Sequence, residues 1–176
     1  MSAGRPGARE LWLFADESKD PAYVMAAVHV EPTDAASVRK QLRGLLLGGQ
    51  SRLHMAKESR RRQRLLASFL LDSGLPVFLY RCSSQVRPRD AIVRRLAMDA
   101  YTFGAARLVL EQDATTSESD ARIIYDVAHS GNRTPSLRYE HLPARSEPLL
   151  WLPDMAAWMW NSSKYRGPTP FEIVWA

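Results

Sequence analysis

The sequence predicts an α/β domain in three layers, with a mixed central sheet that opens with an antiparallel hairpin and is flanked by helices. Three observations support this prediction. Apolar, strand-like runs alternate with helical patterns along most of the chain, which favours a sheet covered by helices. A short turn joins the first two runs, and a short connection implies antiparallel pairing. The first run is apolar on both alternating faces, so it should be covered on both sides.

The opening hairpin is expected from residues 9–16 and 23–30. In "RELWLFAD" the two alternating faces carry apolar residues such as Leu13 and Phe14, which is typical of a strand in the middle of a sheet. "DESKDPA" contains Asp, Ser and Pro, the usual turn residues. "YVMAAVHV" then has the composition of a second strand.

Two helices with a short strand between them should follow. "PTDAASVRKQLRGLLL", residues 32–47, begins with proline and a capping residue and stops at two glycines, as a helix does. "SRLHMA", residues 51–56, is expected to be a third, short strand. From residue 59 to 71, leucine and phenylalanine recur at three- and four-residue spacing behind an arginine face, which predicts a second helix ending near Gly74.

The remaining elements continue the alternation. Strands are expected at 75–83, 107–113 and 136–142, and helices at 88–106, 117–131 and 147–163. The last helix contains Pro153, which leaves open a division into two pieces. Because no repeat or linker divides the chain, we expect one domain at 9–164, a disordered tail at 1–8 and a C-terminal extension at 165–176.

Composition narrows the class of protein. The 176 residues suit one domain, and 45% hydrophobic with 24% charged residues is typical of a soluble globular protein. No apolar stretch approaches the about 18 residues of a membrane span, and the first ten residues lack the apolar core of a signal peptide, so we expect a cytoplasmic protein. The single cysteine, Cys82, lies in an apolar run and is interpreted as an inert core residue.

Positive charge is concentrated in one part of the chain, although the net charge is only +5. Residues 39–64 include nine Lys or Arg residues and a single acid, Glu58, whereas residues 111–126 include five acids and one base, Arg122. A local positive face can bind a polyanion, of which nucleic acid is the commonest; a solvated helix face is the alternative. The candidate nucleic-acid-binding residues are Lys19, Arg52, Lys57, Arg60, Arg61, Arg62 and Arg64.

Three carboxylates occur in apolar surroundings. Asp16 ends the first strand, Glu111 ends "RLVLE", and Asp154 is the only acid in a tryptophan-rich run. A buried carboxylate requires a cation, hydrogen-bond donors or protonation, and two-metal phosphoryl-transfer sites need several that converge, since Mg²⁺ and Mn²⁺ prefer oxygen ligands. Each acid also has a structural alternative: a turn for Asp16 and Glu17, a strand-end surface acid for Glu111, and a helix start for Asp154.

The order of four motifs resembles a known family. "ADES" closes the first strand, "LHMAKE" follows, a later strand ends in an acid, and "LPDMAAW" lies in a late apolar helix. This order is similar to that of the bacterial domain-of-unknown-function family numbered 3800, which is grouped with the ribonuclease H-like fold. The matching positions are Asp16, Glu17 and Ser18, then His54, then Asp154, with Pro153 where the family more often has a small residue. The resemblance covers roughly residues 11–161 and implies a ribonuclease H-like fold.

The chain departs from that pattern in two ways. Lys19 stands where the family usually has glycine, which places an ammonium group close to the carboxylates. Ribonuclease H-like enzymes also use an acid near the start of the helix after the third strand, for which Glu58 is the candidate and a surface acid the alternative. The next strand, "LPVFLYRCSS", ends without an acid. Glu111, which ends the strand after that one, would therefore have to supply the strand-end carboxylate, with Asp113 as a weaker substitute.

His54 is a candidate general base or phosphate contact, because a histidine changes charge near pH 6.5. Lys57, one turn later, would add a fixed positive charge. A packing role at the junction of a strand and a helix is the alternative for His54. The other three histidines, His29, His129 and His141, have no metal-ligand spacing around them and are interpreted as structural.

These patterns lead to the hypothesis of a divalent-metal-dependent nuclease that hydrolyses RNA or DNA. Asp16, Glu111 and Asp154 would hold Mg²⁺ or Mn²⁺, with Glu17 and Glu58 beside them. The rival hypothesis is a catalytically silent module that binds nucleic acid or protein on the same fold, which the missing acid and Lys19 favour. A phosphatase for small esters is a weaker third, because "LLLGGQSR" lacks the P-loop lysine. The tryptophan-rich end should be mostly core, with the remainder available for a homodimer.

Overall fold

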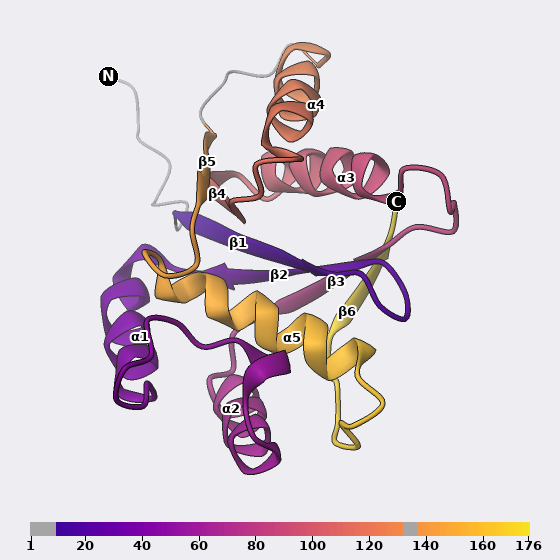
Figure 1. Ribbon diagram of the computed structural model, residues 1–176. Helices are drawn as coiled ribbons and strands as arrows, with labels where there is room; N and C mark the ends of the chain where they lie inside the picture. The colour runs from indigo at the N-terminus through magenta and orange to yellow at the C-terminus, as the bar shows by residue number, and fades with distance from the viewer. Residues whose placement is uncertain (1–9, 132–136) are drawn as a thin grey trace, which may run out of the picture.

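The computed structural model describes residues 10–131 and 137–176 and shows a six-stranded sheet between two layers of helices (Figure 1). The strands are β1 (Leu11–Ser18), β2 (Val24–Val30), β3 (Val77–Arg81), β4 (Ala105–Glu111), β5 (Arg138–Leu142) and β6 (Glu172–Trp175). The helices are α1 (Pro32–Gly44), α2 (Arg60–Asp72), α3 (Pro88–Thr102), α4 (Ser117–His129) and α5 (Trp151–Asn161), with short 3₁₀ helices η1 (Met55–Lys57) and η2 (Pro148–Leu150). This confirms the predicted fold class.

The sheet is mixed and has the order β5-β4-β1-β2-β3-β6. β1 pairs antiparallel with β2, and β2 with β3, whereas β4 runs parallel to β1, β5 to β4, and β6 to β3. The predicted opening hairpin is therefore present. Because β1 and β4 are parallel neighbours, their carboxyl ends lie at the same edge. Ala15 pairs with Leu110, so Asp16 and Glu111 follow at the next position of each strand.

Two hydrophobic cores hold the layers together. On one face of the sheet, Phe14 and Trp151 belong to a core with α1, α2 and α5; on the other, Leu13 and Leu96 belong to a core with α3 and α4 (Figure 1). Successive residues of a strand point to opposite faces, which is why neighbouring residues of β1 enter different cores. The two apolar faces seen in the sequence of β1 thus correspond to two helical layers.

Residues 51–56 do not form the expected strand. Leu53 and Met55 are fully buried, and their spacing of two imitates a strand pattern. The chain instead turns into η1, where the Gln63 side-chain amide donates a hydrogen bond of 2.8 Å to the main-chain oxygen of Met55. This segment brings His54 to Asp154, in the first turn of α5.

The C-terminal segment 165–176, expected to be an extension of the domain, supplies β6 at the edge of the sheet. The Arg81 guanidinium lies 4.7 Å from the ring centroid of Trp175 and 5.8 Å from that of Trp160, so β6 is also held by side chains. The expected disordered tail at 1–8, and the start of the expected strand at 136, lie outside the described residues.

Several helix boundaries also differ from expectation: the helix predicted at 32–47 ends at Gly44, and the one predicted at 117–131 ends at His129. The helix predicted at 88–106 ends at Thr102, where Gly104 has the positive φ of 68° that ends helices, and β4 begins at Ala105. The division of the last helix falls before Trp151, not around Pro153, because proline is tolerated in the first turn of a helix. Across the described ranges, none of the helices has both the length and the apolar character needed to cross a membrane.

Candidate active site

A polar cavity of about 370 Å³ lies at the carboxyl ends of β1 and β4, next to the first turn of α5. It is lined by Asp16, Glu17, Gln50, Arg52, His54, Lys57, Glu58, Glu111 and Asp154. All six candidate catalytic residues are among them. A second hollow of about 390 Å³ continues from the same acids to Asp113. The structure therefore brings together residues that are up to 138 positions apart, from Asp16 to Asp154.

Rigid elements hold the three candidate metal ligands. Asp16 follows Ala15 in β1, and Glu111 follows Leu110 in β4; both preceding residues are buried in the core. Asp154 lies in the first turn of α5, a helix whose neighbouring residues are almost all buried. Because each carboxylate comes from an element fixed by the core, their approach is a property of the fold.

The three carboxylates influence one another electrostatically. Burial raises the pKa of Asp16 well above its ordinary value, and the negative charges of Glu111 and Asp154 raise it further. A side-chain hydrogen bond with Glu111 acts in the same direction, whereas Arg52 opposes it. Asp16 also accepts a hydrogen bond of 2.8 Å from the main-chain N–H of Glu17. The site thus concentrates more negative charge than its surroundings accommodate easily.

Positive and polar groups already contact two of these acids. Arg52 donates a hydrogen bond of 2.6 Å from Nη1 to Oε1 of Glu111. The main-chain N–H of Met55 donates to Oδ2 of Asp154 at 2.8 Å, and Nδ1 of His54 lies 3.1 Å from Oδ1 of the same residue. Asp154 therefore fastens the segment around η1 to α5, in addition to any chemical role.

The three carboxylates are of the right chemical type to bind a hard divalent cation, because carboxylate oxygens are the ligands that Mg²⁺ and Mn²⁺ prefer. A cation would also relieve the repulsion that raises the pKa of Asp16. Within residues 10–131 and 137–176, no three or more His, Cys, Asp or Glu side chains are grouped so as to hold a metal ion in this arrangement. The Arg52 guanidinium already contacts one carboxylate oxygen of Glu111.

Glu17 belongs to a different cluster from Asp16. Its carboxylate forms an ion pair with Arg89 and accepts a hydrogen bond of 3.0 Å from the Tyr23 hydroxyl. Lys19 Nζ lies 3.0 Å from Glu17 Oε1 and 3.9 Å from Asp113 Oδ2. The ammonium group that the sequence placed close to the carboxylates therefore pairs with Glu17 and the neighbouring Asp113.

Sequence reasoning missed Arg89, a residue of α3 that joins this cluster to the helical layer formed by α3 and α4. Arg89 donates to both oxygens of Asp120, at 3.0 and 2.6 Å, and Asp120 is fully buried. His141 Nε2 lies 3.0 Å from the same carboxylate. The only signal in the sequence was the position of Arg89 directly after a helix-starting proline, which does not indicate a buried partner.

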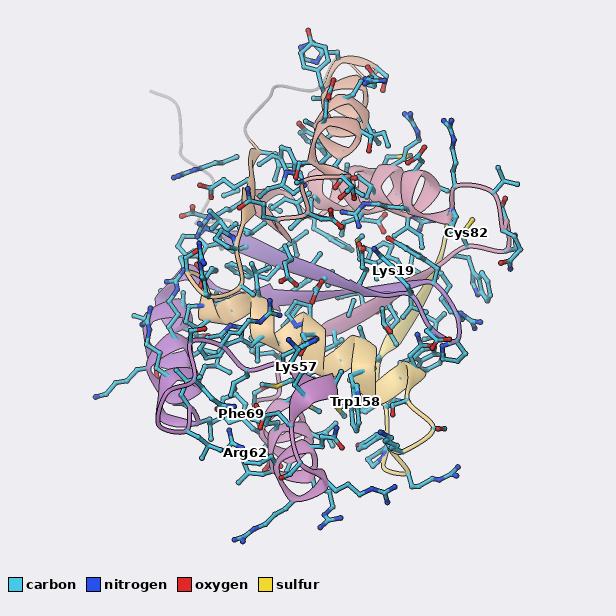
Figure 2. The ribbon with its side chains drawn as sticks, viewed as in Figure 1. Lys19, Lys57, Arg62, Phe69, Cys82 and Trp158 are labelled. Carbon is cyan, nitrogen blue, oxygen red and sulfur yellow. The ribbon has the colours of Figure 1, made fainter. Side chains whose placement is uncertain are left out.

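The remaining basic candidates are divided between several places. Lys57 is exposed on η1 at the mouth of the cavity (Figure 2). Arg62 contacts Glu58 at 3.2 Å, and Glu58 also accepts a hydrogen bond of 2.9 Å from Gln50, so these side chains hold the loop against α2. Arg60 and Arg64 line a separate groove, while Arg61 is exposed.

Comparison with known proteins identifies the fold. No protein-family model matches the chain, and no curated protein matches it either. Among solved structures, it is similar to ribonuclease HII in the structure of the PCNA:RNase HII complex from Archaeoglobus fulgidus, with a TM-score of 0.55 and 14% sequence identity over 89% of this chain and 80% of that chain. The fold is ribonuclease H-like. Sequence identity at this level shows the fold alone.

The ribonuclease H-like topology clarifies the position of Glu111. If residues 51–56 formed a strand, β4 would come one strand too late in the chain for Glu111 to be the strand-end acid of the site. Since 51–56 is a loop, β4 is the fourth strand and the parallel neighbour of β1. Glu111 is consequently placed beside Asp16, whereas Asp113 lies beyond the strand, where it accepts hydrogen bonds from Thr115 before α4.

Proposed function

We propose that the protein is a divalent-metal-dependent nuclease that hydrolyses phosphodiester bonds of RNA or DNA. The observation that carries the proposal is the convergence of Asp16, Glu111 and Asp154 on one polar cavity at the carboxyl edge of a ribonuclease H-like sheet, where burial, and then the charges of Glu111 and Asp154, raise the pKa of Asp16. Carboxylates that repel one another in a cavity open to solvent are the arrangement that a cation would stabilise. As part of this proposal, the protein is a member of the family numbered 3800, which the order of the motifs around Asp16, His54 and Asp154 supports.

Asp16, Glu111 and Asp154 would hold Mg²⁺ or Mn²⁺, which when bound would supply an activated water and neutralise charge on the scissile phosphate. His54 is oriented by Asp154 through Nδ1, so its Nε2 is the nitrogen available to the phosphate or leaving group. Lys57 at the mouth adds a charge that attracts the backbone without reading bases. Glu17 and Glu58 position Lys19, Arg89 and Arg62 around the cavity.

A second candidate is a catalytically silent module that binds nucleic acid or protein on the same fold. The observation that favours it is the 2.6 Å contact between Arg52 and Glu111, because an internal cation already neutralises one of the three acids. In this alternative, the arginine would replace an ion as the partner of the cluster. Metal binding distinguishes the two candidates.

The first test is cleavage by the Asp16→Asn variant. With Mg²⁺ or Mn²⁺, wild-type protein should cut labelled RNA or DNA, and the variant should lose more than about a hundredfold in rate, because removing one electrostatic group from a phosphoryl-transfer site has effects of this size. Glu118→Gln is the control: Glu118 is an exposed acid on α4 whose nearest cation, Arg122, is 3.7 Å away. Full activity in Asp16→Asn would exclude the assigned site.

Calorimetric titration with Mn²⁺ separates the nuclease from the silent module. Wild-type protein should bind Mn²⁺, and Asp154→Asn should remove most of the heat, because it replaces a charged ligand while keeping an oxygen for the Met55 N–H. Wild-type protein that binds nucleic acid but no Mn²⁺ would support the silent module and overturn the nuclease.

A further inference from the structure

A second groove, of about 430 Å³, lies between α2 and the segment that follows α5. The residues that characterise it are Arg60, Arg64, Trp158, Lys164, Tyr165 and Arg166. Four of these six side chains carry a positive charge, and none of the groove's lining residues in the described chain is acidic. The groove therefore presents an unneutralised positive rim to solvent, and its charge is complementary to a polyanion.

Two aromatic rings form part of the groove. The ring centroids of Trp158 and Tyr165 are 6.2 Å apart, and the ring planes are tilted by 59°. Both side chains are partly exposed. The Tyr165 hydroxyl donates a hydrogen bond of 2.8 Å to the main-chain oxygen of Pro168, which holds the phenol in place. Cationic side chains that surround exposed aromatic rings are the combination that binds unpaired nucleotides, since the bases stack and the phosphates pair.

The groove adjoins the carboxylate cavity through two elements. Asp154 and Trp158 are four residues apart on α5, so they lie on the same side of the helix, separated by about 6 Å along its axis. Glu58 lines the cavity, and Arg60, at the start of α2, lines the groove. Figure 2 shows Lys57 and Trp158 along the same side of the molecule, on η1 and α5.

We propose that this groove binds a single-stranded segment of nucleic acid, with a base on the rings of Trp158 and Tyr165 and phosphates on Arg60, Arg64, Lys164 and Arg166. This proposal rests on the proposed function, which makes the adjoining cavity the place of cleavage. It deepens that function by naming the substrate as a nucleic acid with an unpaired stretch beside the cleavage position. A duplex would not suit the groove, because paired bases cannot stack on protein rings.

The contribution of the bases is tested by anisotropy of a labelled ten-nucleotide oligo-dT in EDTA, compared with an abasic strand of equal length. Wild-type protein should bind oligo-dT about tenfold more tightly, the size of one stacked base. Equal affinity for the two strands, or competition by polyglutamate of equal charge as strong as that by oligo-dT, would overturn the proposal, because the groove would then recognise charge alone.

The contribution of the phosphates is tested by salt dependence. The double variant Arg60→Gln/Arg64→Gln should reduce the slope of log affinity against log salt by about 1.4, that is about 0.7 for each lost contact with a single strand. Arg94→Gln/Arg122→Gln is the matched control, because it removes the same charge from exposed positions on α3 and α4, across the sheet. Equal slopes in the two double variants would exclude the groove.

Gly167 offers a test that leaves every charge in place. A Cβ at this position would collide with the phenol of Tyr165, so Gly167→Ala should displace the ring. We expect weaker binding of oligo-dT and unchanged binding of the abasic strand. Gly48→Ala is the control, since a Cβ there meets nothing within 4 Å. Unchanged oligo-dT binding in Gly167→Ala would contradict the stacking role.

These measurements separate failure of the groove from failure of the nuclease. Binding in EDTA needs no metal, so it is also measured in the Asp16→Asn variant. Intact groove binding without any metal-dependent cleavage by wild-type protein would refute the nuclease and leave the groove. Metal-dependent cleavage that the groove variants leave unchanged, together with unchanged oligo-dT binding, would refute the groove and leave the nuclease.

Discussion

Asp16 and Glu17 show that a difference of one position in a strand decides which cluster of side chains a residue joins. Adjacent residues of a strand point to opposite faces. Phe14 belongs to the core with α5 and Ala15 to the core with α3 and α4, and the two acids continue this alternation. Asp16 therefore meets Glu111 and Asp154, while Glu17 meets Arg89. Their neighbourhood in sequence gives no indication that they serve in different clusters.

The partners of these acids were beyond what the sequence reveals. Arg52 is 59 positions from Glu111, and its hydrogen bond depends on the course of the loop before η1. Arg89 reaches Glu17 from α3, on the face of the sheet to which Glu17 points. The acids themselves could be predicted, because a carboxylate at the end of an apolar strand is unusual. Which cation faces each acid is decided by packing between distant elements.

His29 provides a prediction on pH dependence. Burial lowers its pKa to about 4, opposed by the charge of Asp99. The ring stacks on Phe78 at 4.3 Å, and in the described chain Nε2 has no hydrogen-bond partner. Since the ordinary pKa is 6.5, protonation favours the unfolded state, and stability is lost as the pH falls from about 6.5 to 4. His29→Phe should remove about 2 kcal/mol of the loss between pH 7.5 and 5.

Urea denaturation at both pH values measures this difference. His129→Phe is the control, because His129 is exposed at the end of α4. If wild-type protein and His29→Phe lose the same free energy of unfolding on acidification, folding does not lower the pKa of His29, contrary to the prediction.

At the scale of elements, Asp154 connects η1 to α5. The Met55 N–H is fully buried with its residue and donates to Oδ2 of Asp154. Asp154→Ala should therefore reduce the free energy of unfolding by about 1–3 kcal/mol more than Asp154→Asn does, because alanine leaves the N–H unpaired and asparagine retains an acceptor. Both variants remove the same charge, so their difference in chemical denaturation isolates the hydrogen bond. Equal losses would show that solvent satisfies the Met55 N–H.

Most elements could be predicted from periodicity, and the exceptions share a cause. Residues 51–56 alternate like a strand because Leu53 and Met55 are buried, but in the part of the chain that the structure describes they do not pair with the sheet. β6 has only four residues and follows Pro168 and Pro170, so its run of strand-forming residues is too short to indicate a strand. In both segments, the outcome depends on whether a pairing partner lies beside the chain. A single-sequence pattern does not contain that information.

At the scale of the whole molecule, the sheet order predicts that β2 is the strand most resistant to unfolding. All seven residues of β2 are buried, and β1 and β3 pair with it on both sides. Amides of β2 should therefore exchange with deuterium most slowly, through global unfolding, while amides of the edge strand β6 exchange faster through local opening. Hydrogen exchange followed by mass spectrometry measures this. Slower exchange in β6 than in β2 would contradict the assigned sheet order.

The fold class was accessible from the sequence because it depends on the alternation of elements and on one short hairpin. The site was accessible only in part. Its acids could be named, but the groove beside it is built from α2 and from residues 164–168, which have no secondary-structure pattern. Tyr165 gains its place through contact with Trp158 and Pro168, and both contacts depend on the return of the chain after α5.

The hydrogen bond from the Met55 N–H to Asp154 has a practical consequence for spectroscopy. The amide nitrogen lies 2.8 Å from the carboxylate oxygen, so its proton experiences any change in the charge of that carboxylate directly. The Met55 resonance is therefore an internal reporter on the cavity: it senses protonation of the acid or arrival of an ion without a label, a substrate or a change in the protein.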